Sequence, residues 1–227
     1  MEIIAHIRTD FPTKFGIPRQ SGLVSTLRGS IVFTPPYRNA DALRGLEGFS
    51  HLWLIWDFSE AHREGWSPTV RPPRLGGNVR LGVFATRSPF RPNPIGLSCV
   101  KIEGIELHTP EGPIVHVSGA DMLDGTPLFD IKPYLAVSDA HPEARCGFAE
   151  ETAAQPPLTV SIPDALLQTL APDRQQALQQ ILAADPRPRY HADPQRIYAF
   201  EFAGAHIRFR VDDETHCLSV LSETEQD

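Results

Sequence analysis

Several features that would assign this chain to a familiar class of protein are missing from its sequence. Its three cysteines, Cys99, Cys146 and Cys217, are odd in number and form no CxxC pair, which argues against a disulfide framework and a thiolate zinc site. The nine histidines form no HxxxH or HExxH pattern. No charged-then-apolar leader and no apolar run long enough to span a bilayer is present, so we expect a cytoplasmic location without membrane contact.

Positive charge is also scarce, and its distribution is uneven. The formal net charge of −7 argues against a protein that coats nucleic acid without specificity. However, residues 12–40 hold four Lys or Arg and no acid, and residues 65–102 hold six and no acid. Residues 151–227, in contrast, hold six arginines and 12 acids. Two basic tracts in an acidic chain are compatible with phosphate recognition at one site, the alternative being chance clustering with acids folded alongside.

Helical periodicity is nearly absent before residue 160, and no GxGxxG motif follows a strand, so no Rossmann-type nucleotide site is indicated. Short runs of β-forming residues separated by Gly and Pro turns predict an antiparallel barrel or sandwich instead. The strongest run is HLWLIWDF at residues 51–58, which we expect to be buried on both faces, with its tryptophans in the core. The other expected strands are residues 3–7, 28–33, 80–85, 97–102, 106–108, 114–118 and 129–134.

The pattern changes after residue 135. With 227 residues and 41% apolar content, the chain can bury a core in one large domain or in a main domain with a smaller second one. Two helical pieces at residues 163–170 and 172–184 precede three further strand-like runs. We therefore predict a mainly β domain over residues 1–140, a connector over 141–154 and a small α+β domain over 155–227.

The stretch GVFATRSPFRPNPIGLS at residues 82–98 is unlike an ordinary core segment. It places Arg87 and Arg91 four residues apart among three prolines, which restrict the backbone on which both guanidinium groups are carried. Such a loop suits an anionic or planar ligand, and the alternative is a surface loop whose arginines pair with carboxylates. The turn DPRPRY at residues 185–190 again places arginines next to prolines. Its Arg187 and Arg189 suit a phosphate, and its Tyr190 suits a stacked base.

Four motifs occur in an order that resembles one known family. They are PRQ at residues 18–20, FSHLWLIWDF at 49–58, the stretch at 82–98 and DGTPLFDIKPYL at 124–135. In this order they resemble the TrmO (TsaA-like) family of S-adenosylmethionine-dependent tRNA methyltransferases. The resemblance implies a small antiparallel β-barrel and a homodimer that binds S-adenosyl-L-methionine near the subunit interface. It also implies methylation of N6 of N6-threonylcarbamoyladenosine, the tRNA nucleotide 3′ of the anticodon.

The resemblance also implies which residues contact the cofactor, and the remaining arginines are candidates for contacts with the RNA. The cofactor contacts fall by motif match on Pro18, Arg19, Gln20, Arg87, Leu97, Leu123, Asp124, Gly125 and Thr126, together with His62 and Arg63. The arginines that we assign to tRNA phosphates are Arg71, Arg74, Arg80, Arg91, Arg187 and Arg189. The threonyl carboxylate of the substrate needs a cation as well, and Arg91 or Lys101 suits it.

Methyl transfer from a sulfonium is an in-line displacement, which demands positioning rather than a metal or a strong nucleophile. A carbamoylated N6 is a poor nucleophile, so a general base helps; the candidates are Asp121, Asp124, Asp130 and His62, and the sequence does not choose among them. The main alternative is a non-catalytic β-barrel module that binds tRNA or a nucleotide. A cofactor-using enzyme that acts on a small molecule is a third interpretation.

Overall fold

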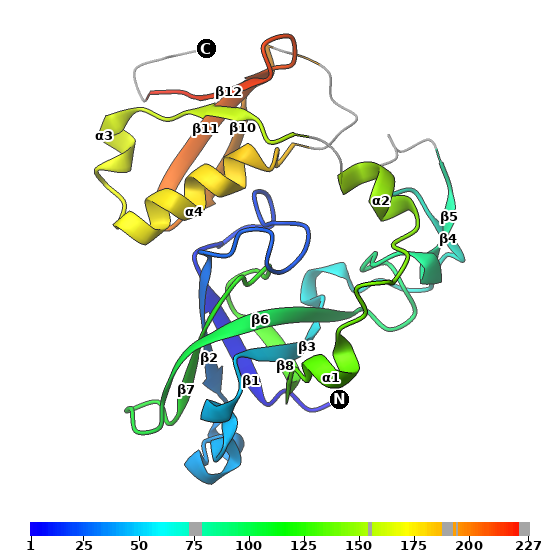
Figure 1. Cartoon of the computed structure of the whole chain (residues 1–227), viewed down its shortest axis with the longest axis vertical. Coiled ribbons are helices and arrows are strands. Elements are labelled where there is room, and N and C mark those ends of the chain that lie inside the picture. Colours follow the sequence, from blue (N-terminus) through cyan, green and yellow to red (C-terminus); the bar gives the residue numbers. More distant parts are fainter. Residues whose placement is uncertain (73–78, 154–155, 188–192, 194, 223–227) are drawn as a thin grey trace.

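The computed structural model describes residues 1–72, 79–153, 156–187, 193 and 195–222. Its larger part is a closed barrel of six strands in the order β1-β2-β7-β6-β3-β8, and every pair of neighbours is antiparallel (Figure 1). The strands are β1 (Ala5–Thr9), β2 (Arg28–Phe33), β3 (His51–Asp57), β6 (Ile95–Glu106), β7 (Ile114–Ser118) and β8 (Thr126–Pro133). The mainly β prediction is confirmed, and the structure selects the barrel over the sandwich.

Strand β3 shows how the sequence builds the barrel wall. Leu52, Leu54 and Trp56 point inward and are buried, while the residues between them are half-buried on the outer face. The expectation that β3 is buried on both faces is therefore wrong for its outer face. There Trp53 packs against Tyr134 and donates a hydrogen bond to Asp139 at the end of α1 (Ala136–Asp139), so α1 covers only part of the face.

Two strand predictions need correction. The expected strand at residues 97–102 is part of the longer β6, whose pairing with β7 shifts between Ile102 and Gly104. No strand forms at residues 107–108, because β6 ends at Glu106. The expected strand at residues 80–85 is instead the two-residue β5 (Leu81–Gly82), paired with β4 (Thr69–Val70), and then a 3-10 turn over Val83–Ala85. Apolar residues alone do not make a strand here, because the Pro- and Gly-rich flanks leave no longer partner to pair with.

A second sheet lies beyond one end of the barrel (Figure 1) and has the order β10-β11-β12-β9, with only the β12–β9 pair parallel. Its elements are β9 (Thr159–Ser161), α3 (Asp164–Leu167), α4 (Pro172–Ala183), β10 (Tyr198–Phe202), β11 (Ala205–Asp212) and β12 (Cys217–Val220). The helix α2 (Phe148–Ala153) precedes it. This is the expected α+β unit, whereas the boundaries 1–140, 141–154 and 155–227 stay a prediction. Within the described residues, no helix is both long and apolar enough to cross a membrane.

The described residues form two hydrophobic cores, and the second one is shared between the two parts. The barrel core consists of inward residues of its strands, such as Ile7, Leu54 and Val117. The second core joins α4 and the second sheet to Phe11, Val24 and Leu27, which come from the connection between β1 and β2. This connection, residues 10–27, is called the rim loop below. Figure 1 shows it in blue, reaching from the barrel toward α4 and the second sheet.

Gly96 offers a test of the barrel packing. It lies opposite Trp56 in the β3–β6 pairing, and a Cβ added there would overlap the Trp56 indole. We expect Gly96→Ala to lower the free energy of unfolding by about 1–3 kcal/mol, as overpacking does. Gly104→Ala on the same strand is the matched control, because its Cβ would meet nothing within 4 Å. Urea unfolding of both variants checks this, and equal stabilities would contradict the packing described here.

Candidate functional site

Two of the predicted cofactor motifs meet at the rim of the barrel. The Arg87 guanidinium donates a hydrogen bond to the side-chain oxygen of Gln20, although the two residues are 67 positions apart. The Gln20 amide nitrogen in turn donates to the backbone carbonyl of Arg19 at 2.6 Å. The rim loop and residues 82–98, called the arginine–proline loop below, therefore lie side by side.

A half-buried carboxylate lies beside this contact. Asp121 accepts a hydrogen bond from the Ser98 hydroxyl at 2.6 Å, and Ser98 accepts one from the Trp56 indole at 3.0 Å. Burial raises the pKa of Asp121 to about 6, although the Ser98 hydrogen bond, the Ser21 backbone and the positive charge of Arg87 all act in the opposite direction. The chain Trp56–Ser98–Asp121 thus connects the barrel interior to the rim.

Ser98 and Ser21 are site residues that the sequence analysis did not single out. Ser98 is only 1% exposed, and the Ser21 hydroxyl accepts a hydrogen bond from the Cys99 amide at 3.1 Å. The signal for Ser98 was present, because it occupies an inward position of β6 between apolar inward neighbours. A polar residue at a buried strand position needs a polar partner, and here the partner is Asp121.

The turn at residues 123–126 lies at the same end of the barrel and is held by β1 and the residues just after it. The Asp124 carboxylate accepts a hydrogen bond from the Thr9 amide at 2.9 Å, and the Gly125 amide donates to the Ile7 carbonyl at 2.8 Å. Gly125 has φ +76°, which favours glycine, and the Thr126 hydroxyl closes the turn on the Leu123 carbonyl at 2.7 Å. The Asp124 carboxylate therefore stabilises its own turn.

The loop after β3 also reaches the arginine–proline loop. The Arg63 guanidinium lies over the Phe90 ring, 4.5 Å from its centroid, while His62 lies 2.7 Å from the Asp57 carboxylate. The Trp66 and Phe84 rings pack together, with their centroids 5.9 Å apart. Large exposed apolar side chains gather around these contacts, and they are Trp66, Phe84, Phe90 and Leu97. The rim thus offers arginines and exposed apolar surface together.

Asp130, another candidate base, and Lys101, a candidate to bind the threonyl carboxylate of the substrate, each have a partner within the protein. Asp130 pairs with Lys132 at 2.9 Å rather than with an arginine. Lys101 pairs with Glu103 at 3.1 Å. In the described part of the chain, no group of three or more His, Cys, Asp or Glu could hold a metal ion.

The arginines assigned to tRNA differ in their environment. Arg71 and Arg80 are exposed, and Arg91 is half-buried, donating to the Thr86 carbonyl at 3.0 Å. Arg187 is a correction, because its side chain is 8% exposed and its guanidinium is held by Asp185 and Asp213 at 2.9 and 2.8 Å. Burial and pairing with two carboxylates make it a poor ligand for a phosphate. The assignments to Arg74 and Arg189, like Tyr190, lie outside the described residues.

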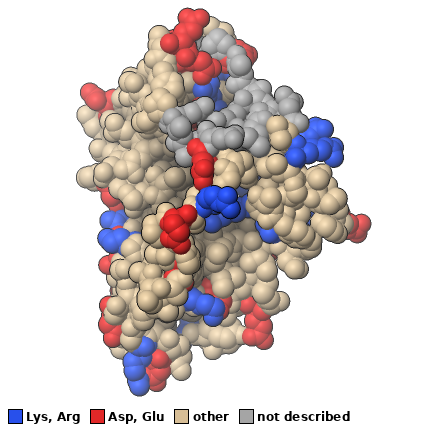
Figure 2. All heavy atoms as spheres, turned by 45° about the vertical axis from the view of Figure 1, so that its right-hand side comes forward, with Lys and Arg blue, Asp and Glu red and all other residues tan. Residues whose placement is uncertain are grey.

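Charge on the surface is local rather than continuous. On the face shown in Figure 2, the described basic and acidic side chains are scattered over a largely uncharged surface. On this face the described residues form no continuous basic patch, in keeping with the net charge of −7.

The structure is thus a closed antiparallel β-barrel with an arginine- and proline-rich loop at its rim, joined to an α+β unit. Two family models match the sequence: the tRNA-methyltransferase O N-terminal domain over residues 6–140 and the TrmO C-terminal domain over residues 155–223. Since the first alone covers more than half of its length, the chain belongs to the TrmO family.

Individual relatives agree over nearly the whole chain. The tRNA (adenine(37)-N6)-methyltransferase of Escherichia coli K12 is 42% identical over 219 residues, which cover 93% of each chain. A Pseudomonas aeruginosa relative with the words S-adenosylmethionine-dependent methyltransferase in its name is 43% identical over 203 residues, or 86% of this chain and 85% of its own. A crystal structure of TrmO from P. aeruginosa superposes with a TM-score of 0.76 at 36% identity, covering 97% of this chain and 93% of that one.

The raised pKa of Asp121 gives a prediction with a definite sign. The folded protein holds this proton more tightly than the unfolded chain, so the stabilisation is full below about pH 4 and is lost as pH rises through about 6. We expect the unfolding free energy of the wild type, relative to Asp121→Asn, to fall by about 2–3 kcal/mol between about pH 4 and 7. Urea unfolding of both proteins over this range checks it. A constant difference would contradict the burial of an ionisable Asp121.

Proposed function

We propose that this protein is an S-adenosylmethionine-dependent tRNA methyltransferase that methylates N6 of the adenosine at position 37, with N6-threonylcarbamoyladenosine as its substrate base. The observation that carries the proposal is the match to the Escherichia coli tRNA (adenine(37)-N6)-methyltransferase over 93% of both chains. The threonylcarbamoyl group and a homodimeric assembly are further parts of the proposal, and they rest on the family resemblance. A cytoplasmic location is also part of it and rests on the sequence alone.

The rim residues fit such a cofactor, because they combine charge with exposed apolar surface. S-adenosyl-L-methionine supplies an activated methyl group on a sulfonium when bound. Arg87 and Arg19 suit its carboxylate, and Leu97, which is 51% exposed at the rim, suits its apolar parts. We assign the remaining binding contacts to Pro18, Gln20, His62, Arg63 and the turn at residues 123–126.

The contacts of the four base candidates are unequal. Asp124 serves its turn, Asp130 pairs with Lys132, and His62 lies against Asp57. Asp121 is the candidate whose pKa burial raises toward neutrality, the property that efficient proton transfer near pH 7 requires. We therefore assign acceptance of the N6 proton to the Asp121 carboxylate.

The tRNA surface is proposed to extend from the arginine–proline loop toward β4 and β5. Arg80 and Arg71 are exposed there, and Arg80 lies 3.4 Å from the Thr69 hydroxyl. Trp66 and Phe84 are 51% and 71% exposed, and aromatic rings at such positions stack on unpaired bases or pack against a second subunit. A single-stranded anticodon loop presents phosphates, which arginines bind, and unpaired bases, on which aromatic rings stack.

Methyl transfer itself is the first test. The purified protein, incubated with S-adenosyl-L-methionine and tRNA carrying N6-threonylcarbamoyladenosine, is expected to convert this nucleoside to its N6-methyl form, measured by mass spectrometry of digested tRNA. Unmodified tRNA transcript is the control substrate. Under the same conditions, Asp121→Asn should lower the rate by about 10²–10⁴-fold if Asp121 takes the proton. Binding of both ligands without methylation would favour the non-catalytic module.

A crossed pair of variants separates the two classes of arginine. Arg87→Ala is expected to weaken cofactor binding about 10-fold or more, because a charged hydrogen bond is lost, and to leave the salt dependence of tRNA binding unchanged. Arg80→Ala should flatten the slope of log K against log salt for tRNA by about 1 and keep the cofactor affinity. Calorimetry and filter binding measure the two quantities. Unchanged cofactor affinity in Arg87→Ala would overturn its assignment.

A further inference from the structure

The predicted cofactor residues 18–20 lie on the rim loop, and this loop is packed by the second sheet. Phe11, Val24 and Leu27 of the loop are buried in the core formed by α4 and the sheet. The Phe15 ring stacks on Phe209 of β11, with centroids 6.4 Å apart and an interplanar angle of 10°. The barrel alone therefore does not determine the conformation of this loop.

A tight backbone approach beside Phe15 adds to this packing. Gly16 has φ +95°, and a Cβ at this position would lie 2.5 Å from the Phe200 ring of β10. A larger residue would be strained by its backbone conformation and would push the loop from the sheet. The loop is thus fitted to the sheet at its backbone as well as at its side chains.

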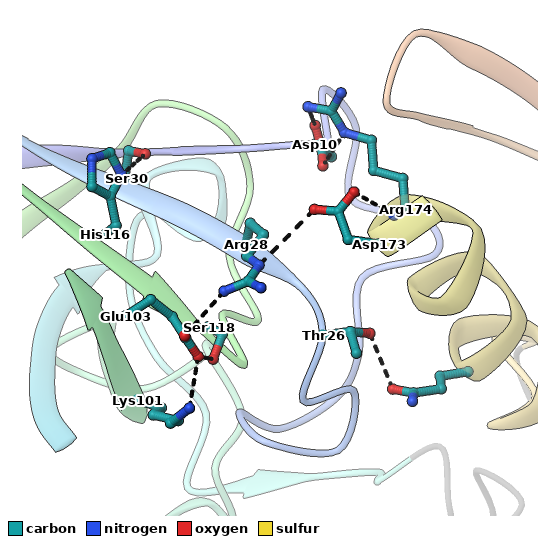
Figure 3. A network of polar contacts seen from close by, with 11 residues as sticks. Asp10, Thr26, Arg28, Ser30, Lys101, Glu103, His116, Ser118, Asp173 and Arg174 are labelled. Carbon is teal, nitrogen blue, oxygen red and sulfur yellow. Dashed lines mark hydrogen bonds and ion pairs between the residues drawn. The ribbon is translucent and has the colours of Figure 1, made fainter. Parts of the chain in front are cut away.

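Both ends of the rim loop are tied to α4 by polar contacts (Figure 3). Asp10 at the first end forms a two-pronged ion pair with Arg174, at 3.0 and 2.9 Å. At the other end, the Thr26 hydroxyl lies 3.3 Å from the Gln180 side-chain oxygen, and Arg28 reaches Asp173 at 4.0 Å. Such exposed pairs contribute little stability on their own, so their effect is to fix the position of the loop on the helix.

The tip of the loop has its own contact with the C-terminal part. One guanidinium nitrogen of Arg19 donates to the backbone carbonyl of Arg187 at 2.8 Å. Arg187 is immobilised in turn, because Asp185 binds it through two hydrogen bonds of 2.9 Å and Asp213 through bonds of 2.8 and 3.3 Å. Its side chain is 8% exposed, and Asp185 adopts φ +51°, which is uncommon for a residue other than glycine.

We propose that Arg187 is a positioning residue of the cofactor site: locked by Asp185 and Asp213, it presents its carbonyl to Arg19 and holds residues 18–20 in the conformation that binds the cofactor. The contact continues from Arg19 through Gln20 to Arg87 on the opposite loop. A loop ordered during folding does not have to be ordered at binding, so the C-terminal unit increases cofactor affinity without touching the cofactor. This inference rests on the proposed function of the rim.

Asp213→Asn is the variant of choice, because Arg187→Met would leave two carboxylates together and risks misfolding of the C-terminal unit. Asp213 is half-exposed, and the change removes its charge while keeping its shape. We expect calorimetry to show about 2- to 10-fold weaker affinity for S-adenosyl-L-methionine, the effect of losing about one hydrogen bond. The KM for tRNA should be unchanged. The matched control is Glu201→Gln, which removes another carboxylate of the same sheet, paired with His206, and should behave as wild type.

A double-mutant cycle distinguishes positioning from a general loss of stability. If Asp213 acts through Arg19, then Asp213→Asn should weaken cofactor binding little in an Arg19→Met background. Amide hydrogen exchange gives an independent readout: residues 12–26 should exchange faster in Asp213→Asn than in wild type or Glu201→Gln, in the absence of any ligand. Thermal unfolding confirms that each variant is folded.

Several results would overturn the inference. Unchanged cofactor affinity and unchanged exchange in Asp213→Asn, or additive effects in the cycle, would show that Arg187 does not position the loop. A raised KM for tRNA with normal cofactor affinity would instead place the C-terminal unit on the tRNA. If the wild type binds no S-adenosyl-L-methionine, the proposed function fails, while the exchange comparison still decides whether Arg187 orders the loop.

Discussion

The packing of the rim loop against the second sheet is the interaction on which the rest of the structure depends. Phe11 and Phe15 leave the barrel and enter a core made by residues about 150 to 200 positions later in the chain. Phe11 is fully buried and Phe15 partly buried there, and together they contribute a few kcal/mol, more than the ion pairs around them. The apolar contact therefore joins the two parts, and the polar contacts determine how the loop lies.

The rim site combines an ordered loop with a buried charge. Trp56 and Ser98 hold the Asp121 carboxyl at the end of a polar chain, and Arg87 lies close enough to favour its ionised form. An isolated carboxylate at this depth would be strongly destabilising. Its partners reduce that penalty but leave the pKa raised, so the structure keeps a titratable group close to the place where the two predicted cofactor loops meet.

Much of the fold could be predicted from the sequence, because strand periodicity and turn residues are local signals. The barrel strands around His51–Asp57, the turn at residues 123–126 and the α+β character of the end of the chain all follow from such signals. Arg187 was misassigned for the opposite reason. Its burial depends on Asp213, which is 26 positions away and reaches it only through the folded sheet. The pairing of Arg87 with Gln20 is equally non-local, and only the order of the motifs pointed to it.

The backbone at Gly16 limits how this architecture can be divided. Its close approach to Phe200 and the burial of Phe11, Val24 and Leu27 mean that one surface of the barrel is complementary to a single partner sheet. A barrel separated from residues 155–227 would carry an uncovered aromatic surface next to its candidate cofactor site. Transplanting the barrel as an independent module therefore requires redesign of the rim loop, whose apolar side chains would otherwise be exposed to water.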